Sequence, residues 1–279
     1  MIVAVSAHSG VMSGARRRGS RLDQLPSWVL GLVGVAVFLL IWELVPRLGL
    51  ADPDYLPPAS QVLQIFVRNL GLTSFWVAVG HTMTGWALGL AIASVAAVVL
   101  GLVIGSSSFL RQATHSTIEF LRPIPSVALI PLAVLLFGVS LRSTLLLVVY
   151  ASFWQVLIQV LYGVTDVDVV ASNTARSYGL GRLARVRYVV WPTTLPYLMT
   201  GLRLGAAVAL ILAVTSELVI GVPGLGHEIA LAQSGGAETA MYALVLATGL
   251  IGVAINLVMR FVERRVLAWH PSVRGEVHA

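Results

Sequence analysis

Five polar side chains stand inside long apolar stretches of the chain, where their types point to contact with a solute or with a neighbouring helix. They are His81, Gln155, Gln159, Glu217 and Asn256. A polar or charged side chain in a lipid environment is costly unless it faces protein or water, so these residues are candidates for a transport pathway or its gate. Except for Glu217, each could instead form a hydrogen bond between helices. Gln155 and Gln159 are one helical turn apart and therefore share a face.

The chain lacks the residue sets that nucleotide, metal and catalytic sites need. It contains no lysine and no cysteine. This excludes a phosphate-binding loop that ends in Gly-Lys-Ser/Thr, thiolate metal ligands and a cysteine nucleophile. The 6 histidines show no ligand spacing to one another, and no catalytic triad can be assembled from the sequence. We therefore expect no enzyme activity, no metal site and no cofactor in this chain.

The elements that position these polar residues must lie in a membrane. Of 279 residues, 57% are hydrophobic and only 11% are charged, and the mean hydropathy is +0.89. This composition is too apolar for a soluble domain with a charged surface. The formal net charge is +6 and all 18 basic residues are arginine. In a multi-pass protein such a surplus reflects orientation in the bilayer, so we expect no nucleic-acid partner.

A helix needs about 20 apolar residues to cross the hydrocarbon layer. Six stretches qualify, near 28–46, 74–105, 118–138, 142–163, 195–220 and 240–262. With both termini in the cytoplasm, only Arg47, Arg68 and Arg142 of the basic residues fall outside, as the positive-inside rule requires. The fold prediction is an all-α, polytopic integral membrane protein with six transmembrane helices and both termini cytoplasmic.

The predicted domain organisation is simple. Residues 1–27 form a flexible basic tail, 28–265 a single transmembrane domain, and 266–279 a cytoplasmic C-terminal tail. The apolar run after residue 28 is too long for a cleaved signal peptide, so it is interpreted as a retained first span. Prolines interrupt the third stretch. Residues 56–68 predict a short amphipathic helix, packed either on the outer membrane surface or on the protein itself.

The largest polar interruption between spans is the loop 166–194. Ala171, Ala175 and Gly179 recur every four residues, which predicts a helical face with little side-chain bulk. Asn173-Thr174-Ala175 is followed by three residues, Gly179, nine residues and then Val189-x-Trp191-Pro192. We expect Pro192 and Pro196 to end this helical element before the fifth span.

This spacing resembles the coupling loop of ABC importer permeases, whose pattern is Glu-Ala-Ala, three residues, Gly, nine residues and Ile-x-Leu-Pro. The last Ala, the Gly and the Pro are kept here, and the leading acid is replaced by Asn173. The segment 122–138 and the segment 216–226 resemble the third-span entry and the fifth-span close of permeases for sulfonates, taurine, nitrate and related small solutes. The resemblance covers most of residues 75–260.

The resemblance implies a bacterial inner-membrane permease subunit that forms the pathway for such a solute and acts as a pair, most simply a homodimer. The implied partners are cytoplasmic ABC ATPase subunits, which supply ATP hydrolysis, an extracytoplasmic solute-binding protein and the lipid bilayer. The implied ATPase-coupling residues are Ala171, Asn173, Thr174, Ala175, Tyr178, Gly179, Arg182 and Pro192.

Two residues at the ends of spans have specific expected roles. Glu217 precedes the Gly-Leu-Gly turn at 224–226, and a match to the family's acid there implies that it braces an external gate, since it would repel an anionic solute. Arg122 either orients the helix break at Pro123 and Pro125 or contacts a lipid headgroup.

Two other functions compete with this one. An ion-coupled secondary transporter needs an intramembrane ionisable relay, to which only Glu43 and Glu217 come close, and both lie near span ends. A membrane scaffold without transport would need neither the broken third span nor the polar residues within spans.

Overall fold

The computed structural model describes residues 27–269, and within that range the chain is built from helices without any strand. In chain order they are α1 (Ser27–Arg47), α2 (Ala59–Asn69), α3 (Thr73–Gly105), α4 (Ser108–Leu121), η2 (Ser126–Leu129), α5 (Ile130–Phe137), α6 (Leu141–Thr165), α7 (Val169–Ser177), α8 (Arg182–Arg185), η3 (Val186–Val190), α9 (Trp191–Ile220), α10 (Leu225–Ser234) and α11 (Glu238–Val266). The two predicted tails lie largely outside the described residues.

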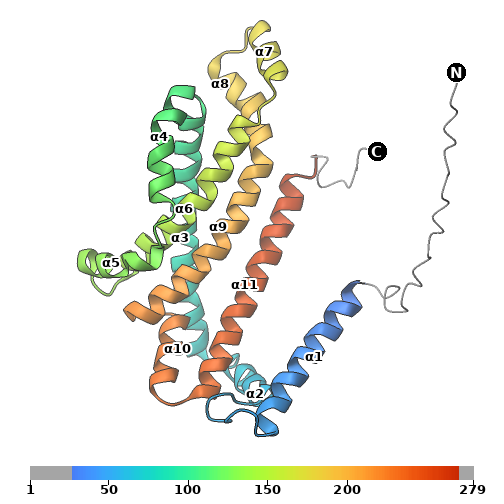
Figure 1. Cartoon of the computed structure of the whole chain (residues 1–279), viewed down its shortest axis with the longest axis vertical. Helices are drawn as coiled ribbons and strands as arrows, with labels where there is room; N and C mark the ends of the chain where they lie inside the picture. Colours follow the sequence, from blue (N-terminus) through green and yellow to red (C-terminus); the bar gives the residue numbers. More distant parts are fainter. Residues whose placement is uncertain (1–26, 270–279) are drawn as a thin grey trace, which may run out of the picture.

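Five helical segments are long and apolar enough to cross a membrane, and a bent helix pair would make a sixth span. The five are Val29–Arg47, Thr73–Gly105, Leu141–Thr165, Arg182–Ile220 and Glu238–Val266. The longest helices run lengthwise through the molecule, tilted against one another, and form its body (Figure 1). The prediction of an all-helical, multi-pass membrane fold is confirmed, whereas the cytoplasmic location of both termini stays a prediction.

The third predicted span is a bent pair of helices rather than one straight helix. Ser108–Leu121 and Ser126–Phe137 meet at an angle of 80°. Pro123 and Pro125 lie in the break, where each lacks a backbone donor and restricts the residue before it. Pro131, by contrast, lies at the start of α5, where a missing N–H costs nothing. The stretch predicted at 118–138 therefore contains the break, and helical structure begins already at Ser108.

The prediction that Pro192 and Pro196 end the loop helix is wrong. The chain is helical without interruption from Arg182 to Ile220, and Val186 and Trp191 have right-handed helical backbone angles. Pro192 lies directly after the π-helical turn η3, and Pro196 lies one turn further on inside α9. The π-helical turn η3 precedes them, and such turns absorb irregularities in hydrogen bonding.

Glycines on α3 let this helix lie close to α6. A Cβ added to Gly89, Gly101 or Gly105 would come within 2.8–3.0 Å of the Cβ of Val148, Val160 or Val164 respectively. Each pair is separated by the same number of residues, so α3 and α6 run parallel. α9 completes the core against α6, where Gly201 approaches the backbone of Val156. Small residues at helix contacts are typical of membrane bundles, because they permit dispersion contacts over a long interface.

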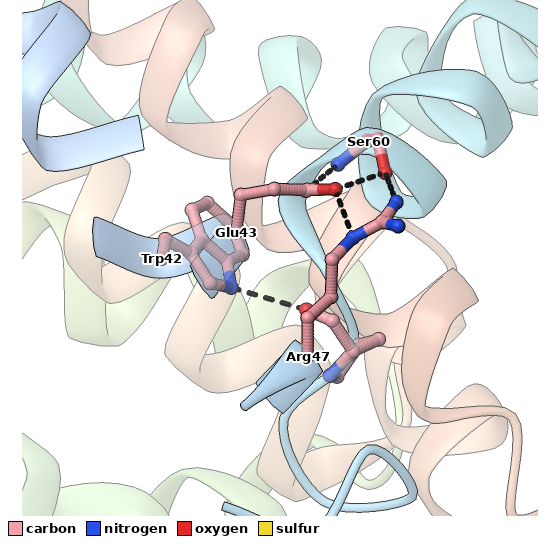
Figure 2. A network of polar contacts seen from close by, with 5 residues as sticks. Trp42, Glu43, Arg47 and Ser60 are labelled. Atoms are coloured by element: carbon pink, nitrogen blue, oxygen red, sulfur yellow. Dashed lines mark hydrogen bonds and ion pairs between the residues drawn. The ribbon is translucent and has the colours of Figure 1, made fainter. Parts of the chain in front are cut away.

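α1 stands apart from most of this core and meets the rest of the protein at one end of the molecule (Figure 1), where it contacts α2 and where Trp42 packs against Tyr242 of α11, with ring centroids 6.2 Å apart. Figure 2 shows the corner where they meet. The Glu43 carboxylate accepts hydrogen bonds from the Ser60 backbone N–H and hydroxyl, both at 2.9 Å, and from Arg47 Nε at 2.7 Å. Trp42 Nε1 donates to the Pro57 carbonyl at 3.1 Å. Glu43 thereby provides an acceptor for the Ser60 backbone N–H, which lies in the first turn of α2 and has no partner within the helix.

α2 is the amphipathic helix predicted at 56–68. Its Ala59 and Val62 are buried, and the helix packs against α11. Tyr242 of α11 donates from its hydroxyl to the Tyr55 carbonyl at 3.1 Å. Of the two alternatives, packing on the protein itself is therefore the one that the structure shows.

Candidate functional site

α7 projects beyond the helical body at one end of the molecule, beside α8 (Figure 1). Asp168 begins the helix, because its carboxylate accepts a hydrogen bond from the Val170 N–H at 2.7 Å. Gly179 ends it with a φ of 76°, a conformation that glycine adopts without strain. The Leu180 N–H returns to the Ala175 carbonyl and the Gly179 N–H to the Arg176 carbonyl, both at 3.0 Å. This pair of bonds is the Schellman motif.

The predicted small-residue face of α7 is divided in the structure. Ala175 is buried against its own protein, whereas Ala171 and Gly179 are exposed. Asn173 and Thr174 are exposed as well. The predicted small-residue face therefore does not form a single exposed surface.

Large apolar side chains around α7 are exposed, and the sequence prediction included only one of them. Val169, Val170, Tyr178 and Leu183 are 70%, 71%, 81% and 87% exposed. A local signal could have identified the other three. Val169 and Val170 follow an aspartate, and Leu183 follows an arginine, in a loop that is otherwise polar. We call Val169, Val170, Tyr178 and Leu183 the apolar tip.

The two remaining predicted coupling residues lie after α7. Arg182 is exposed at the start of α8, and Pro192 is half-buried in the first turn of α9. Tyr197 fixes the base of the projection, because its hydroxyl donates to the Asp166 carboxylate at 2.8 Å. This bond joins the end of α6 to α9.

Glu217 lies at the opposite end of α9 from α7, and its side chain is almost fully buried, at 2% exposed. Its Oε2 accepts a hydrogen bond from the Thr82 hydroxyl at 2.8 Å and from the Gly226 N–H at 3.0 Å. The Thr82 oxygen in turn accepts from the Leu225 N–H at 2.9 Å. The carboxylate thus joins α3, α9 and the first turn of α10. We call Glu217, Thr82, Leu225 and Gly226 the outer lock.

Two glycines make room for this carboxylate. A Cβ on Gly224 would occupy the place of the Glu217 carboxyl group, and a Cβ on Gly226 would collide with the Val214 carbonyl oxygen. The Gly-Leu-Gly turn noted in the sequence is therefore needed for close approach of backbone and side chain. Sequence reasoning missed Thr82 as the partner of Glu217, because 135 residues separate the two.

His81 and Glu217 meet at a small polar cavity of about 230 Å³ beside the outer lock. Thr84, Ser140 and Thr144 supply further hydroxyl groups to its wall. Two of the five predicted pathway or gate residues are therefore neighbours.

The other three predicted pathway residues lie elsewhere. Gln155 lines a cavity of about 670 Å³ between α4 and α6, and Asn256 lines one of about 730 Å³ between α9 and α11. Gln159 instead packs close to Gly201 of α9, where an added Cβ would lie 3.0 Å from its own Cβ. Gln155 and Gln159 are one helical turn apart on α6, but Gln155 lines the cavity beside α4, whereas Gln159 packs against α9.

Within residues 27–269, no group of three or more histidine or acidic side chains is placed to hold a metal ion.

Comparison with known proteins identifies a family. Residues 97–268 match the family model described as the binding-protein-dependent transport system inner membrane component. The taurine transport system permease protein TauC of Escherichia coli K12 is 32% identical over 250 residues, which cover 88% of this chain and 91% of TauC. The nitrate import permease protein NrtB of Leptolyngbya laminosa is 27% identical, over 74% of each chain.

Solved structures show the same fold at low sequence identity. A chain of the MetNI methionine ABC transporter, in an inward-facing conformation, superposes with a TM-score of 0.61 at 16% identity. The match covers 69% of this chain and 96% of that one.

Proposed function

The chain belongs to the family of binding-protein-dependent transport system inner membrane components and is a multi-pass permease subunit of an ABC importer, and we propose that α7 and the apolar tip are the site at which ATPase subunits drive it. The observation that carries this proposal is the exposure of the apolar tip. Four large apolar side chains next to charged loop residues are costly in water, and a partner protein that covers them removes that cost.

ATP binding and hydrolysis belong to a separate subunit in this proposal, because a chain without lysine cannot form the usual phosphate-binding loop. The ATPase meets the exposed side of α7, including Ala171, Asn173 and Thr174, with Tyr178 and Leu183 as the apolar contacts. Gly179 forms the turn after α7, and Arg182 provides a positive charge at the start of α8. Ala175 and Pro192 act from inside, since one seats α7 on its own protein and the other begins α9.

The continuous helix from Arg182 to Ile220 connects this site to the outer lock. A force that reaches α8 through the turn at Gly179 can therefore be passed along one helix to Glu217. We infer that Glu217 braces an external gate, because its hydrogen bonds hold the first turn of α10 against α3 and α9. A switch of this kind works when nucleotide and partner proteins bind the two states of the permease with different affinity.

The remaining partners follow from the family. We propose that two copies of this chain enclose the pathway and that an extracytoplasmic solute-binding protein delivers a small solute of the taurine, sulfonate or nitrate class. His81, Gln155 and Asn256 each line a cavity, which supports them as pathway candidates. Both termini and α7 lie on the cytoplasmic side in this proposal, with Arg176, Arg182, Arg185 and Arg187 near the inner membrane surface.

The test is capture of the ATPase by an affinity-tagged permease. Leu183→Glu places a charge on the apolar tip, and we expect it to abolish co-purification of the ATPase while membrane insertion stays normal. Leu50→Glu is the matched control, because Leu50 is 74% exposed and belongs to the segment between α1 and α2. That segment lies at the end of the molecule opposite α7 (Figure 1). Normal capture by the Leu183→Glu variant would show that α7 and its tip are not the docking site.

The rival function, an ion-coupled secondary transporter, predicts something different. Its uptake would continue without any ATPase and would stop when the proton or sodium gradient is collapsed. Uptake that requires the co-expressed ATPase excludes it.

A further inference from the structure

The cavity between α4 and α6 that Gln155 lines is also lined by basic side chains, whose role the proposed function does not explain. It measures about 670 Å³ and is lined by Arg111, His115, Glu119, Arg122, Gln155 and Tyr162, with apolar residues and threonines completing the wall. Figure 1 shows α4 at the end of the molecule that also carries α7 and α8. The Tyr150 hydroxyl donates to the Leu121 carbonyl at 2.6 Å. This bond holds the C-terminal end of α4 beside α6.

The charge balance in this cavity is positive. Glu119 is its only acidic residue, and it lies 3.5 Å from His115 Nδ1 on the same helix. Arg111 gives one guanidinium N–H to the Gly105 carbonyl at the end of α3 and keeps its other donors. Among residues 27–269, Arg122 has no side-chain hydrogen bond or ion pair at all. Two guanidinium groups with free donors thus share one cavity.

The neutral polar groups add donors to the same space. Gln155 contributes an amide NH₂ and Tyr162 a hydroxyl, and neither side chain has a hydrogen-bond partner within the described part of the chain. A cavity rich in N–H and O–H donors, with its single carboxylate beside a histidine, matches a ligand that only accepts hydrogen bonds. Sulfonate and nitrate groups are such ligands, and guanidinium groups bind planar or branched oxyanions with two parallel hydrogen bonds.

We propose that this cavity binds the oxyanion group of the transported solute on the α7 side of the pathway, with Arg122 as its main ligand and Arg111, Gln155 and Tyr162 as supporting donors. The inference rests on the proposed function, since it takes the chain to be an importer subunit for small solutes. It adds which part of the solute the permease itself recognises. That part is the negatively charged oxyanion group, and its recognition is separate from the selection made by the binding protein outside. The phosphate of an anionic lipid has the same chemistry and is the competing source.

Ligand-dependent thermal stabilisation of the purified permease–ATPase complex tests the proposal, since a ligand that binds only the folded state raises Tm in a saturable way. The probes are taurine, ethanesulfonate, nitrate and bicarbonate, titrated at constant ionic strength against chloride. We expect at least one probe to raise Tm saturably. Arg122→Gln should weaken its apparent affinity at least tenfold, whereas Arg68→Gln, an exposed arginine on α2, should leave it unchanged.

The outcomes separate the possible failures. Saturable stabilisation by none of the four probes, or equal affinity of wild type and Arg122→Gln, would overturn the inference, and the proposed function would still stand if the ATPase is captured. Failure to capture the ATPase would instead remove the proposed function itself. Reconstitution in nanodiscs with and without phosphatidylglycerol addresses the lipid source. If that lipid alone stabilises wild type more than Arg122→Gln, the cavity is a lipid site and the solute assignment is wrong.

Discussion

The apolar tip and the outer lock stand at opposite ends of one continuous helix and are built in opposite ways. In the outer lock, the buried Glu217 carboxylate finds its donors within the same chain, on Thr82 and Gly226. Around the apolar tip, Tyr178 and Leu183 are more than 80% exposed, and no other residue in the range 27–269 covers them. A buried polar group must be satisfied inside the protein, whereas an exposed apolar group gains only from a partner.

This difference separates the effects of substitutions. Changes in the outer lock should act on the stability of the isolated permease and, through it, on uptake. Changes on the apolar tip should leave that stability unchanged and act on assembly with the ATPase.

Gly226→Ala should have the largest effect on stability. The added Cβ would meet the Val214 carbonyl oxygen and would lie 2.8 Å from the Glu217 Cβ. Because the nearest atom belongs to the backbone, we expect a loss of about 3 kcal/mol, the upper end of the usual overpacking cost. Thermal denaturation in detergent measures it. Gly249→Ala is the control, since no atom lies within 4 Å of its added Cβ; equal stability of the two variants would contradict the close approach.

Removal of the Glu217 carboxylate should cost about 2 kcal/mol, the range for leaving a buried donor unpaired. Glu217→Ala leaves the Gly226 N–H without an acceptor, while Thr82 can still donate to the Ala78 carbonyl. Glu217→Gln keeps one carbonyl oxygen as acceptor and should lose much less stability. Solute uptake reports on the gate: if Glu217→Gln and wild type transport equally, charge is unnecessary there, and if Glu217→Ala also transports normally, the gate role falls.

Thr82→Val should cost about 1 kcal/mol, because it keeps the shape of the side chain and removes one hydroxyl. The Leu225 N–H loses its acceptor, and Glu217 Oε2 keeps only the Gly226 N–H as a donor. Thr84→Val is the control on the same helix, since the Thr84 hydroxyl bonds only to the Gly80 carbonyl of its own helix. Comparison of the two melting curves shows whether the bond across helices matters.

Gly179→Ala should have the smallest effect on the fold, about 1 kcal/mol within α7, because only glycine adopts a φ of 76° without strain. Gly181→Ala is the matched control: its φ is −64° and no atom lies within 4 Å of the added Cβ. We expect Gly179→Ala to weaken ATPase capture and Gly181→Ala to leave it intact. Equal capture would show that the end of α7 need not be fixed for docking.

The positions of the spans could be predicted from hydropathy, because a long apolar stretch such as that of α3 has few alternatives to a membrane helix. The effect of each proline could not. Pro123 and Pro125 lie in a helix break, whereas Pro192 and Pro196 are accommodated by the first turns of α9 and the preceding π-helical turn. Proline thus interrupts one helix and not another. It lacks the N–H that would bond to a carbonyl in the preceding turn, so the outcome depends on the backbone hydrogen bonding around each proline.

Site residues were predictable where the signal is local. The Gly179 turn and the polar loop follow from neighbouring residues, and so do the polar positions within spans. The partner of Glu217 and the separation of Gln155 from Gln159 depend on which helices lie side by side, which a single sequence does not encode locally.

Site-directed labelling tests most directly the claim that α7 and its tip face the cytoplasm and are covered by the ATPase. The chain contains no cysteine, so Tyr178→Cys and Tyr55→Cys each introduce a single thiol at exposed positions, one at each end. In inside-out vesicles, we expect a membrane-impermeant maleimide to label the Tyr178→Cys variant without ATPase and to be blocked when ATPase is bound. The Tyr55→Cys variant should react only in right-side-out vesicles. Labelling of the Tyr178→Cys variant from the outer side, or equal labelling with and without ATPase, would contradict the account.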